Sequence, residues 1–146
     1  MSDILALSQI RVPGTATSKD DAIREAGQIL VDAGAVSPAY VEAMFEREKS
    51  VSTYMGNYLA IPHGTNEAKD AILRSALSVV RYDEPIDWDG NEVRFAVGVA
   101  GVEGGHLEIL GKVAIVFSDA DEVDKLLAAG SAEELYQLLH AVNEDE

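Results

Sequence analysis

Several residue types are missing or scarce in this sequence of 146 residues, and each absence excludes a class of function. There is no cysteine, so disulfide bonds and thiol chemistry are excluded and zinc would lack its usual soft ligands. No apolar run approaches the roughly 18 residues that a membrane-spanning helix requires, and the N-terminus lacks a signal-peptide pattern. We therefore expect a soluble, cytoplasmic protein.

Basic residues are also scarce, because 11 Lys and Arg stand against 26 Asp and Glu and give a formal net charge of −15. Nucleic acid and anionic lipid bind to clustered basic side chains, so we expect neither as a direct partner. The acidic field favours partners with a basic face. Solubility, or tolerance of a salty cytoplasm, explains the same charge equally well.

Apolar periodicity and capping residues predict helices that alternate with strands. Helices are predicted to begin near Ser18, Ser37, Thr65, His106, Asp119 and Ser131. Strands are predicted within residues 4–12, 59–61, 76–82 and 93–100, a loop over 52–56 and turns over 83–90. We see no repeat, linker or low-complexity segment, and the intermixed elements predict a single three-layer domain of the α/β or α+β class over residues 1–146.

The stretch over residues 58–65 places a histidine at the end of a buried strand. Pro62 stops the strand, because proline donates no ladder hydrogen bond, and Gly64 lets another group approach the imidazole of His63 closely. Thr65 then caps a short helix predicted over residues 66–72. A histidine beside the amides of a helix start fits a phosphate acceptor, although Pro-His-Gly by itself also fits an ordinary turn.

A second histidine, His106, follows the strand over residues 93–100 and lies in the first turn of the next helix. The spacing between His63 and His106 does not match the ligand pattern of a metal site. The sequence also lacks the Gly-x-Ser-x-Gly nucleophile elbow of many hydrolases. Phosphoryl transfer through histidine needs one nucleophilic nitrogen with donors for the phosphoryl oxygens. His140, among apolar neighbours in the last predicted helix, is interpreted as a packing or surface residue, and Trp88 as a packing residue.

Four segments together resemble a known family: residues 40–49 (YVEAMFEREK), 53–56 (TYMG), 60–65 (AIPHGT) and 67–70 (EAKD). They are similar to the mannitol/fructose class of phosphotransferase-system (PTS) EIIA domains, PTS EIIA type-2, and within it most similar to the mannitol-specific branch. The resemblance runs from the first helix to the last and covers essentially the whole chain. It implies a mixed, roughly five-stranded sheet with helices on both faces.

The resemblance also implies a phosphotransferase component with a phosphohistidine intermediate. His63 would accept a phosphoryl group on Nε2 from the phosphocarrier HPr, His106 would support it, and Arg47 would neutralise phosphate charge. His63 would then pass the group to a cysteine of EIIB for uptake of mannitol, a related polyol or fructose. No cofactor and no metal would be needed, and the membrane would be reached only indirectly through the EIIBC permease.

Two rival interpretations stay open at the level of sequence. Relatives of the nitrogen branch share the fold and accept phosphate, but act as regulators through protein–protein interaction. A small acidic binding domain without chemistry is the other alternative. For the transport role we expect an apolar docking face around His63, including Met55, with an acidic rim that attracts a basic carrier.

Overall fold

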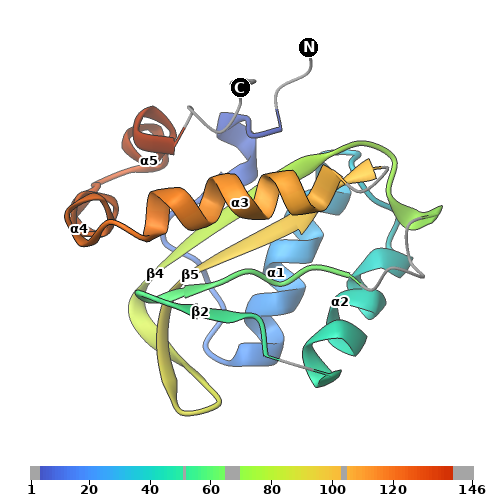
Figure 1. The fold of residues 1–146 in the computed structure, drawn as a ribbon, viewed down its shortest axis with the longest axis horizontal. Coiled ribbons are helices and arrows are strands. Elements are labelled where there is room, and N and C mark those ends of the chain that lie inside the picture. Colours follow the sequence, from blue (N-terminus) through green and yellow to red (C-terminus); the bar gives the residue numbers. More distant parts are fainter. Residues whose placement is uncertain (1–3, 51, 65–69, 103–104, 140–146) are drawn as a thin grey trace.

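The computed structural model describes residues 4–50, 52–64, 70–102 and 105–139, and for residues 105–107 it describes the backbone (Figure 1). The helices are α1 (Lys19–Asp32), α2 (Ala39–Ser50), α3 (Gly105–Phe117), α4 (Ala120–Ala128) and α5 (Ala132–Leu139), with a 3-10 turn η1 (Leu7–Gln9). The strands are β1 (Ile10–Arg11), β2 (Tyr54–Gly56), β3 (Leu59–Ala60), β4 (Ala76–Trp88) and β5 (Asn91–Ala100).

The strands form one mixed five-stranded sheet in the order β1-β4-β5-β3-β2. Strands β4 and β5 are antiparallel and are joined at Asp89-Gly90, whose positive φ angles of 55° and 92° suit a tight hairpin. Strand β3 lies beside β5 and runs parallel to it. The carboxyl ends of β3 and β5 therefore reach the same edge of the sheet, and this edge is where the candidate residues follow.

Helices cover both faces of the sheet, as predicted (Figure 1). Side chains alternate along a strand, so β4 and β5 contribute residues to a core on each face of the sheet. Leu77, Val79, Phe95, Val97 and Val99 belong to the core beneath α3, α4 and α5. Ala76, Ala96 and Ala100 belong to the core beneath α1 and α2. The small residues let α1 approach closely, and the Ser78 hydroxyl donates a 2.8 Å hydrogen bond to the Ala26 carbonyl.

The predicted helix boundaries with clear capping residues are confirmed. The Ser18 hydroxyl accepts a 3.2 Å hydrogen bond from the backbone N–H of Asp21 and caps α1. Gly34 follows α1 with a φ of 75°, a conformation that glycine adopts without strain. Asp119 caps α4 through its side chain, and the Ser131 hydroxyl accepts from a backbone N–H at the start of α5.

The loop predicted over residues 52–56 is wrong, because it contains strand β2. This strand pairs with β3 across a turn in which Gly56, Asn57 and Tyr58 have φ angles of 95°, 52° and 70°. Tyrosine seldom adopts a positive φ, so the sequence did not indicate a hairpin at this point.

The turns predicted over residues 83–88 are also wrong, because β4 continues to Trp88. A register irregularity between Arg81 and Ile86 absorbs the segment that contains Pro85, and pairing with β5 resumes at Ile86. Ile86 and Trp88 are almost completely buried, so the burial of their side chains outweighs the local turn preference. The interpretation of Trp88 as a packing residue is confirmed.

The first predicted strand is shorter than expected. Residues 4–6 do not form a strand, η1 intervenes, and β1 is limited to residues 10–11, although Leu5 is fully buried. Thr65, residues 66–69 of the short helix predicted over 66–72, His140 and the C-terminal tail lie outside the described residues. Within the described part of the chain, no helix combines the length and apolar character needed to cross a membrane.

Candidate functional site

His63 stands where β3 leaves the sheet. It forms an isolated parallel bridge with Val99 of β5, and the Val99 N–H donates to the Pro62 carbonyl at 3.1 Å. The side chain is half-buried. The predicted placement of this histidine at the end of a buried strand is confirmed.

The imidazole of His63 is oriented by its own backbone. Nδ1 lies 2.8 Å from the carbonyl oxygen of Ile61. A carbonyl oxygen only accepts hydrogen bonds, so this contact requires a proton on Nδ1. The neutral ring then carries its lone pair on Nε2, which is the nitrogen that can act as a nucleophile.

The residue after His63 is tied to helix α2. The Tyr40 hydroxyl donates to the Val99 carbonyl at 2.7 Å and accepts from the Gly64 N–H at 2.9 Å. The amide of Gly64 is therefore engaged within the protein. The amides at the start of the helix predicted after Thr65 lie outside the described residues. The lack of a side chain at Gly64 also makes room for Tyr40, because an added Cβ would lie 2.5 Å from Cε1 of Tyr40.

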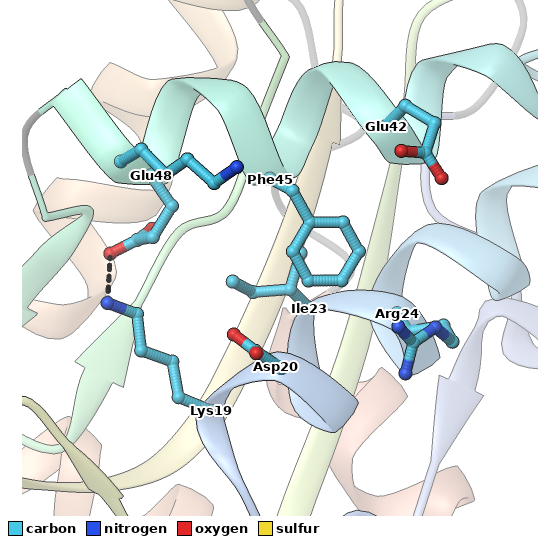
Figure 2. Close-up of a pocket in the computed structure, with 8 residues that line it drawn as sticks. Lys19, Asp20, Ile23, Arg24, Glu42, Phe45 and Glu48 are labelled. Carbon is cyan, nitrogen blue, oxygen red and sulfur yellow. Dashed lines mark ion pairs between the residues drawn. The ribbon is translucent and has the colours of Figure 1, made fainter.

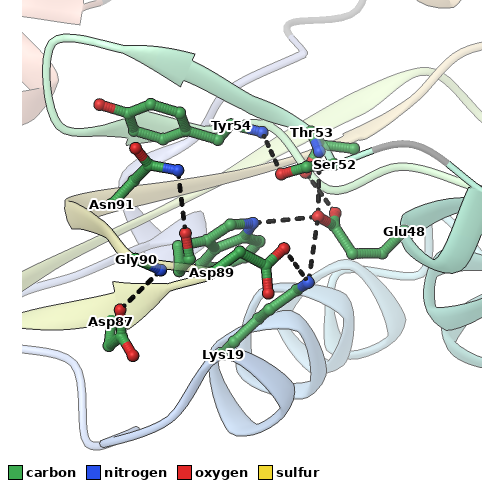
Figure 3. A network of polar contacts seen from close by, with 10 residues as sticks. Lys19, Glu48, Ser52, Thr53, Tyr54, Asp87, Asp89, Gly90 and Asn91 are labelled. Atoms are coloured by element: carbon green, nitrogen blue, oxygen red, sulfur yellow. Dashed lines mark hydrogen bonds and ion pairs between the residues drawn. The ribbon is translucent and has the colours of Figure 1, made fainter.

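Helix α2 carries a buried carboxylate, Glu48, near its end (Figure 3). The carboxylate accepts hydrogen bonds from the Thr53 N–H at 3.0 Å, from the Thr53 hydroxyl and from Nε1 of Trp88 at 3.0 Å. Lys19 Nζ lies 3.6 Å from the same carboxylate and pairs with Asp89 at 2.7 Å. We call Lys19, Glu48, Thr53, Trp88 and Asp89 the Glu48 cluster.

The Glu48 cluster is connected to His63 through backbone hydrogen bonds. Thr53, which Glu48 holds by two hydrogen bonds, accepts from the Ile61 N–H through its own carbonyl at 3.1 Å. The carbonyl of Ile61 in turn accepts from Nδ1 of His63. Helix α2 thus holds the histidine segment from both sides, through Glu48 before His63 and through Tyr40 after it.

Arg47 lies in the last turn of α2 and is half-buried. It follows Tyr40 by seven positions, about two helical turns, so both side chains leave the helix on nearly the same side. The Arg47 side chain thus leaves α2 on nearly the same side as Tyr40, and its role in neutralising phosphate charge stays a prediction.

His106 lies in the first turn of α3, as predicted. Strand β5 ends at Ala100, and α3 begins at Gly105, so the backbone of His106 follows the strand to which His63 is bridged. Both histidines therefore come after the carboxyl ends of parallel neighbours. The side chain of His106 lies outside the described part of the structure.

A cleft of about 350 Å³ between α1 and α2 is a separate feature (Figure 2). It is lined by Lys19, Asp20, Ile23, Arg24, Glu42, Phe45, Glu48 and Lys49. Figure 2 shows Lys19 and Glu48 facing each other across one end, so charges of opposite sign compensate within the cleft. Of the predicted site residues whose side chains are described, neither His63 nor Arg47 lines the cleft.

Sequence reasoning missed Tyr40 and Glu48 as parts of the site. The buried residues of α2 are Tyr40, Ala43, Met44 and Glu48. These four follow i, i+3, i+4 and i+8 spacing, a signal that could have found them. Glu48 was obscured because it stands in a run of charged residues. Among the described residues, no group of three or more His, Asp or Glu side chains could hold a metal ion.

The arrangement can perform nucleophilic catalysis by histidine. One imidazole has a defined tautomer, its backbone is held on both sides, and a guanidinium lies on the helix that holds it. Burial raises the pKa of Tyr40, although the hydrogen bond from Gly64 acts against this, so the hydroxyl stays protonated.

Comparison with known proteins supports a specific family. The family described as "Phosphoenolpyruvate-dependent sugar phosphotransferase system, EIIA 2" matches residues 3–142. The chain is 52% identical, over 97% of each chain, to a mannitol-specific phosphotransferase enzyme IIA component of Halalkalibacterium halodurans.

Solved structures share the fold. The complex of enzyme IIAMTL and phosphorylated enzyme IIBMTL from Escherichia coli matches with a TM-score of 0.86 and 33% identity, covering 92% of this chain and 96% of the other. The nitrogen regulatory protein IIA-Ntr from Neisseria meningitidis matches with a TM-score of 0.77 and 31% identity, covering 93% and 96%.

Proposed function

Because this chain belongs to the EIIA 2 family of the phosphoenolpyruvate-dependent sugar phosphotransferase system, we propose that it carries a phosphoryl group on His63. It takes the group from phospho-HPr and passes it to a cysteine of a mannitol-type EIIB in the cytoplasm. The observation that supports His63 as the acceptor is the contact between its Nδ1 and the Ile61 carbonyl, which leaves the nucleophilic lone pair on Nε2.

Each transfer exchanges one bond to phosphorus for another. Nε2 of His63 attacks the phosphorus of phospho-HPr, the new N–P bond forms, and the bond to the HPr imidazole breaks. The proton on Nδ1 stays in place, and the Ile61 carbonyl stabilises the positive charge that the ring gains. In the second transfer, the EIIB thiolate attacks phosphorus and His63 leaves as a neutral imidazole.

The protein contributes mainly position and charge, because phosphoryl transfer needs little other covalent help. Arg47 neutralises the phosphoryl oxygens with its planar guanidinium, which pairs with phosphate better than an ammonium does. His106, which follows the neighbouring strand, hydrogen-bonds the phosphoryl group or the reacting ring. Tyr40 is almost completely buried, so its role is to hold the backbone at Val99 and Gly64 through hydrogen bonds.

The docking face is the edge of the sheet at which His63 emerges. Val102, just beyond β5, and Leu73, just before β4, are 38% and 64% exposed, and β4 begins opposite the residue where β5 ends. Met55, expected at this face, is 50% exposed on the edge strand β2. The net charge of −15 attracts partners with a basic face.

A regulatory role like that of the nitrogen branch is the second candidate, favoured by the structural match to IIA-Ntr. The mannitol-specific assignment has more support, because the identity is 52% to a mannitol-specific component and 31% to the nitrogen regulatory protein. Both roles include phosphorylation, so only the onward transfer separates them.

Reconstitution tests the proposal. The chain is incubated with phosphoenolpyruvate, enzyme I and HPr, and its intact mass is followed for the wild type, for His63→Ala and for His106→Ala. We expect one added phosphoryl group in the wild type and in His106→Ala, and none in His63→Ala. Loading of His63→Ala with unchanged stoichiometry would contradict the assignment.

The second stage adds a mannitol-type EIIB and follows the label onward. The wild type should transfer the group to the EIIB cysteine. His106→Ala should transfer about 10- to 150-fold more slowly, since it loses a hydrogen bond to a charged group worth roughly 1.5–3 kcal/mol. Normal loading with no onward transfer in the wild type would instead support the regulatory role.

A further inference from the structure

We propose that Tyr40 is a positioning residue for His63: its hydroxyl ties the peptide that follows the histidine to the carboxyl end of β5. The inference rests on the proposed function, because the consequence that it predicts is a slower phosphoryl transfer. Tyr40 is then the third side chain of α2 at the site, beside Arg47 and Glu48.

The hydroxyl of Tyr40 both donates and accepts a hydrogen bond. It donates to the Val99 carbonyl at 2.7 Å and accepts from the Gly64 N–H at 2.9 Å. Val99 is the residue of β5 that bridges to His63, so the hydroxyl joins the backbone on two sides of the histidine. Without it, two buried or partly buried backbone groups would lose their partners, and residues 63–64 would lose their link to α2.

The ring of Tyr40 fixes the same segment by packing. A Cβ on Gly64 would lie 2.5 Å from Cε1 and 2.9 Å from Cζ of Tyr40, so the ring and the Gly64 backbone are in direct contact. Glycine at this position is therefore explained by an internal contact. The two interactions, hydrogen bond and packing, act on the peptide directly after the nucleophile.

Burial separates this role from substrate or partner binding. Tyr40 is 2% exposed, so a docked protein cannot touch it. A change at Tyr40 should consequently alter the rate within the docked complex and leave the affinity for the phosphoryl donor nearly constant. Misplacement of a reacting group by about 1 Å costs on the order of 100-fold in rate.

The chain offers a matched control in Tyr82. It is also 2% exposed, belongs to the same core beneath α1 and α2, and donates one buried hydrogen bond, to Glu25 at 2.8 Å. Tyr40→Phe and Tyr82→Phe therefore delete the same atom from comparable surroundings. Both should lower the thermal midpoint by a similar amount, about 3–8 °C.

The experiment compares the wild type with the two variants in three measurements. These are the maximal rate and KM of loading from phospho-HPr, the thermal midpoint, and the imidazole nitrogen spectrum of His63. We expect Tyr40→Phe to load about 10- to 100-fold more slowly with KM within about twofold, and to lose the dominant Nδ1–H tautomer. Tyr82→Phe should keep the wild-type rate and spectrum. Equal rates and equal spectra in the two variants would overturn the proposal.

Two further measurements test the role of Tyr40 independently of the transfer rate. Amide exchange at Gly64 in the wild type needs no variant: a protected amide supports the hydrogen bond to Tyr40, and one exchanging at the rate of an open loop contradicts it. If the wild type accepts no phosphate, the proposed function fails, whereas the tautomer spectra still decide whether Tyr40 positions His63.

Discussion

Two buried glutamates, Glu25 on α1 and Glu48 on α2, are held by closely similar sets of donors. Each accepts hydrogen bonds from both the N–H and the hydroxyl of one threonine, Thr15 for Glu25 and Thr53 for Glu48. Each also accepts from an aromatic side chain of β4 and pairs with a cation, as follows: Tyr82 and Arg11 for Glu25, Trp88 and Lys19 for Glu48.

The difference lies in what each threonine is attached to. Thr15 belongs to the segment between β1 and α1, so the Glu25 cluster (Arg11, Thr15, Ala16, Glu25 and Tyr82) joins this segment and the middle of α1 to the sheet. Thr53 pairs with Ile61, whose carbonyl orients the His63 ring. The same local arrangement thus stabilises the fold in one place and supports the proposed reaction in the other.

The sharpest test of this comparison replaces each glutamate by glutamine. Both changes remove a negative charge and place an amide NH2 group against buried N–H and O–H donors. We therefore expect each to lower the free energy of unfolding by about 2–4 kcal/mol. Only Glu48→Gln should also slow phosphoryl transfer, by about 10- to 100-fold, because it loosens the support of His63. Transfer rates and denaturant unfolding, measured on both variants, check this. Equal transfer rates in the two variants would remove the distinction.

A smaller effect is expected at Arg47, the neighbour of Glu48 on α2. Arg47→Lys keeps the positive charge but loses the planar fork, so transfer should slow by about 10-fold while stability changes by less than about 0.5 kcal/mol. Arg24→Lys is the control, because Arg24 is an exposed arginine of α1 that pairs with Asp21. Arg24→Lys should leave both quantities unchanged. A rate for Arg47→Lys equal to that of Arg24→Lys would make Arg47 a surface charge.

The third prediction concerns how stability depends on pH through the carboxylate of Glu25. Burial would raise the pKa of Glu25, but hydrogen bonds from Thr15, Arg11, Tyr82 and Ala16 outweigh it and lower the pKa from 4.5 to about 2. Because the folded-state pKa lies below the unfolded one, this stabilisation is complete above about pH 4.5 and is lost as the pH falls to about 2.

The loss should be on the order of 3 kcal/mol in the wild type. It should be absent from the pH profile of Glu25→Gln, which has no proton to bind at this position. Unfolding in denaturant at several pH values between 2 and 6 measures both profiles. Identical profiles for the wild type and Glu25→Gln would show that the carboxylate of Glu25 is not bound as described.

The features that the sequence predicted well are those that depend on a few neighbouring residues. The helix starts at Ser18, Asp119 and Ser131 follow from local capping residues, and the apolar run over residues 93–100 identified strand β5. The position of His63 followed from the proline that stops its strand.

The features that it missed depend on residues distant along the chain. The helical spacing of Glu48 from Tyr40 and Met44 indicates the buried face of α2, but it does not identify the distant residues Lys19, Thr53 and Trp88 that bind the carboxylate. Strand β4 passes through Pro85 because pairing with β5 resumes beyond it. Likewise, the partner of Tyr40 is set by the packing of α2 against the carboxyl ends of β3 and β5.

We propose above all that His63 accepts a phosphoryl group on Nε2, the nitrogen that carries the lone pair of the neutral ring. The most direct measurement is nuclear magnetic resonance of the phosphorylated chain, labelled with ¹⁵N in its histidines, to identify the nitrogen bonded to phosphorus. Because Nδ1 is engaged by the Ile61 carbonyl, phosphorus should be attached to Nε2 of His63. Attachment to Nδ1, or to His106 or His140, would contradict the claim.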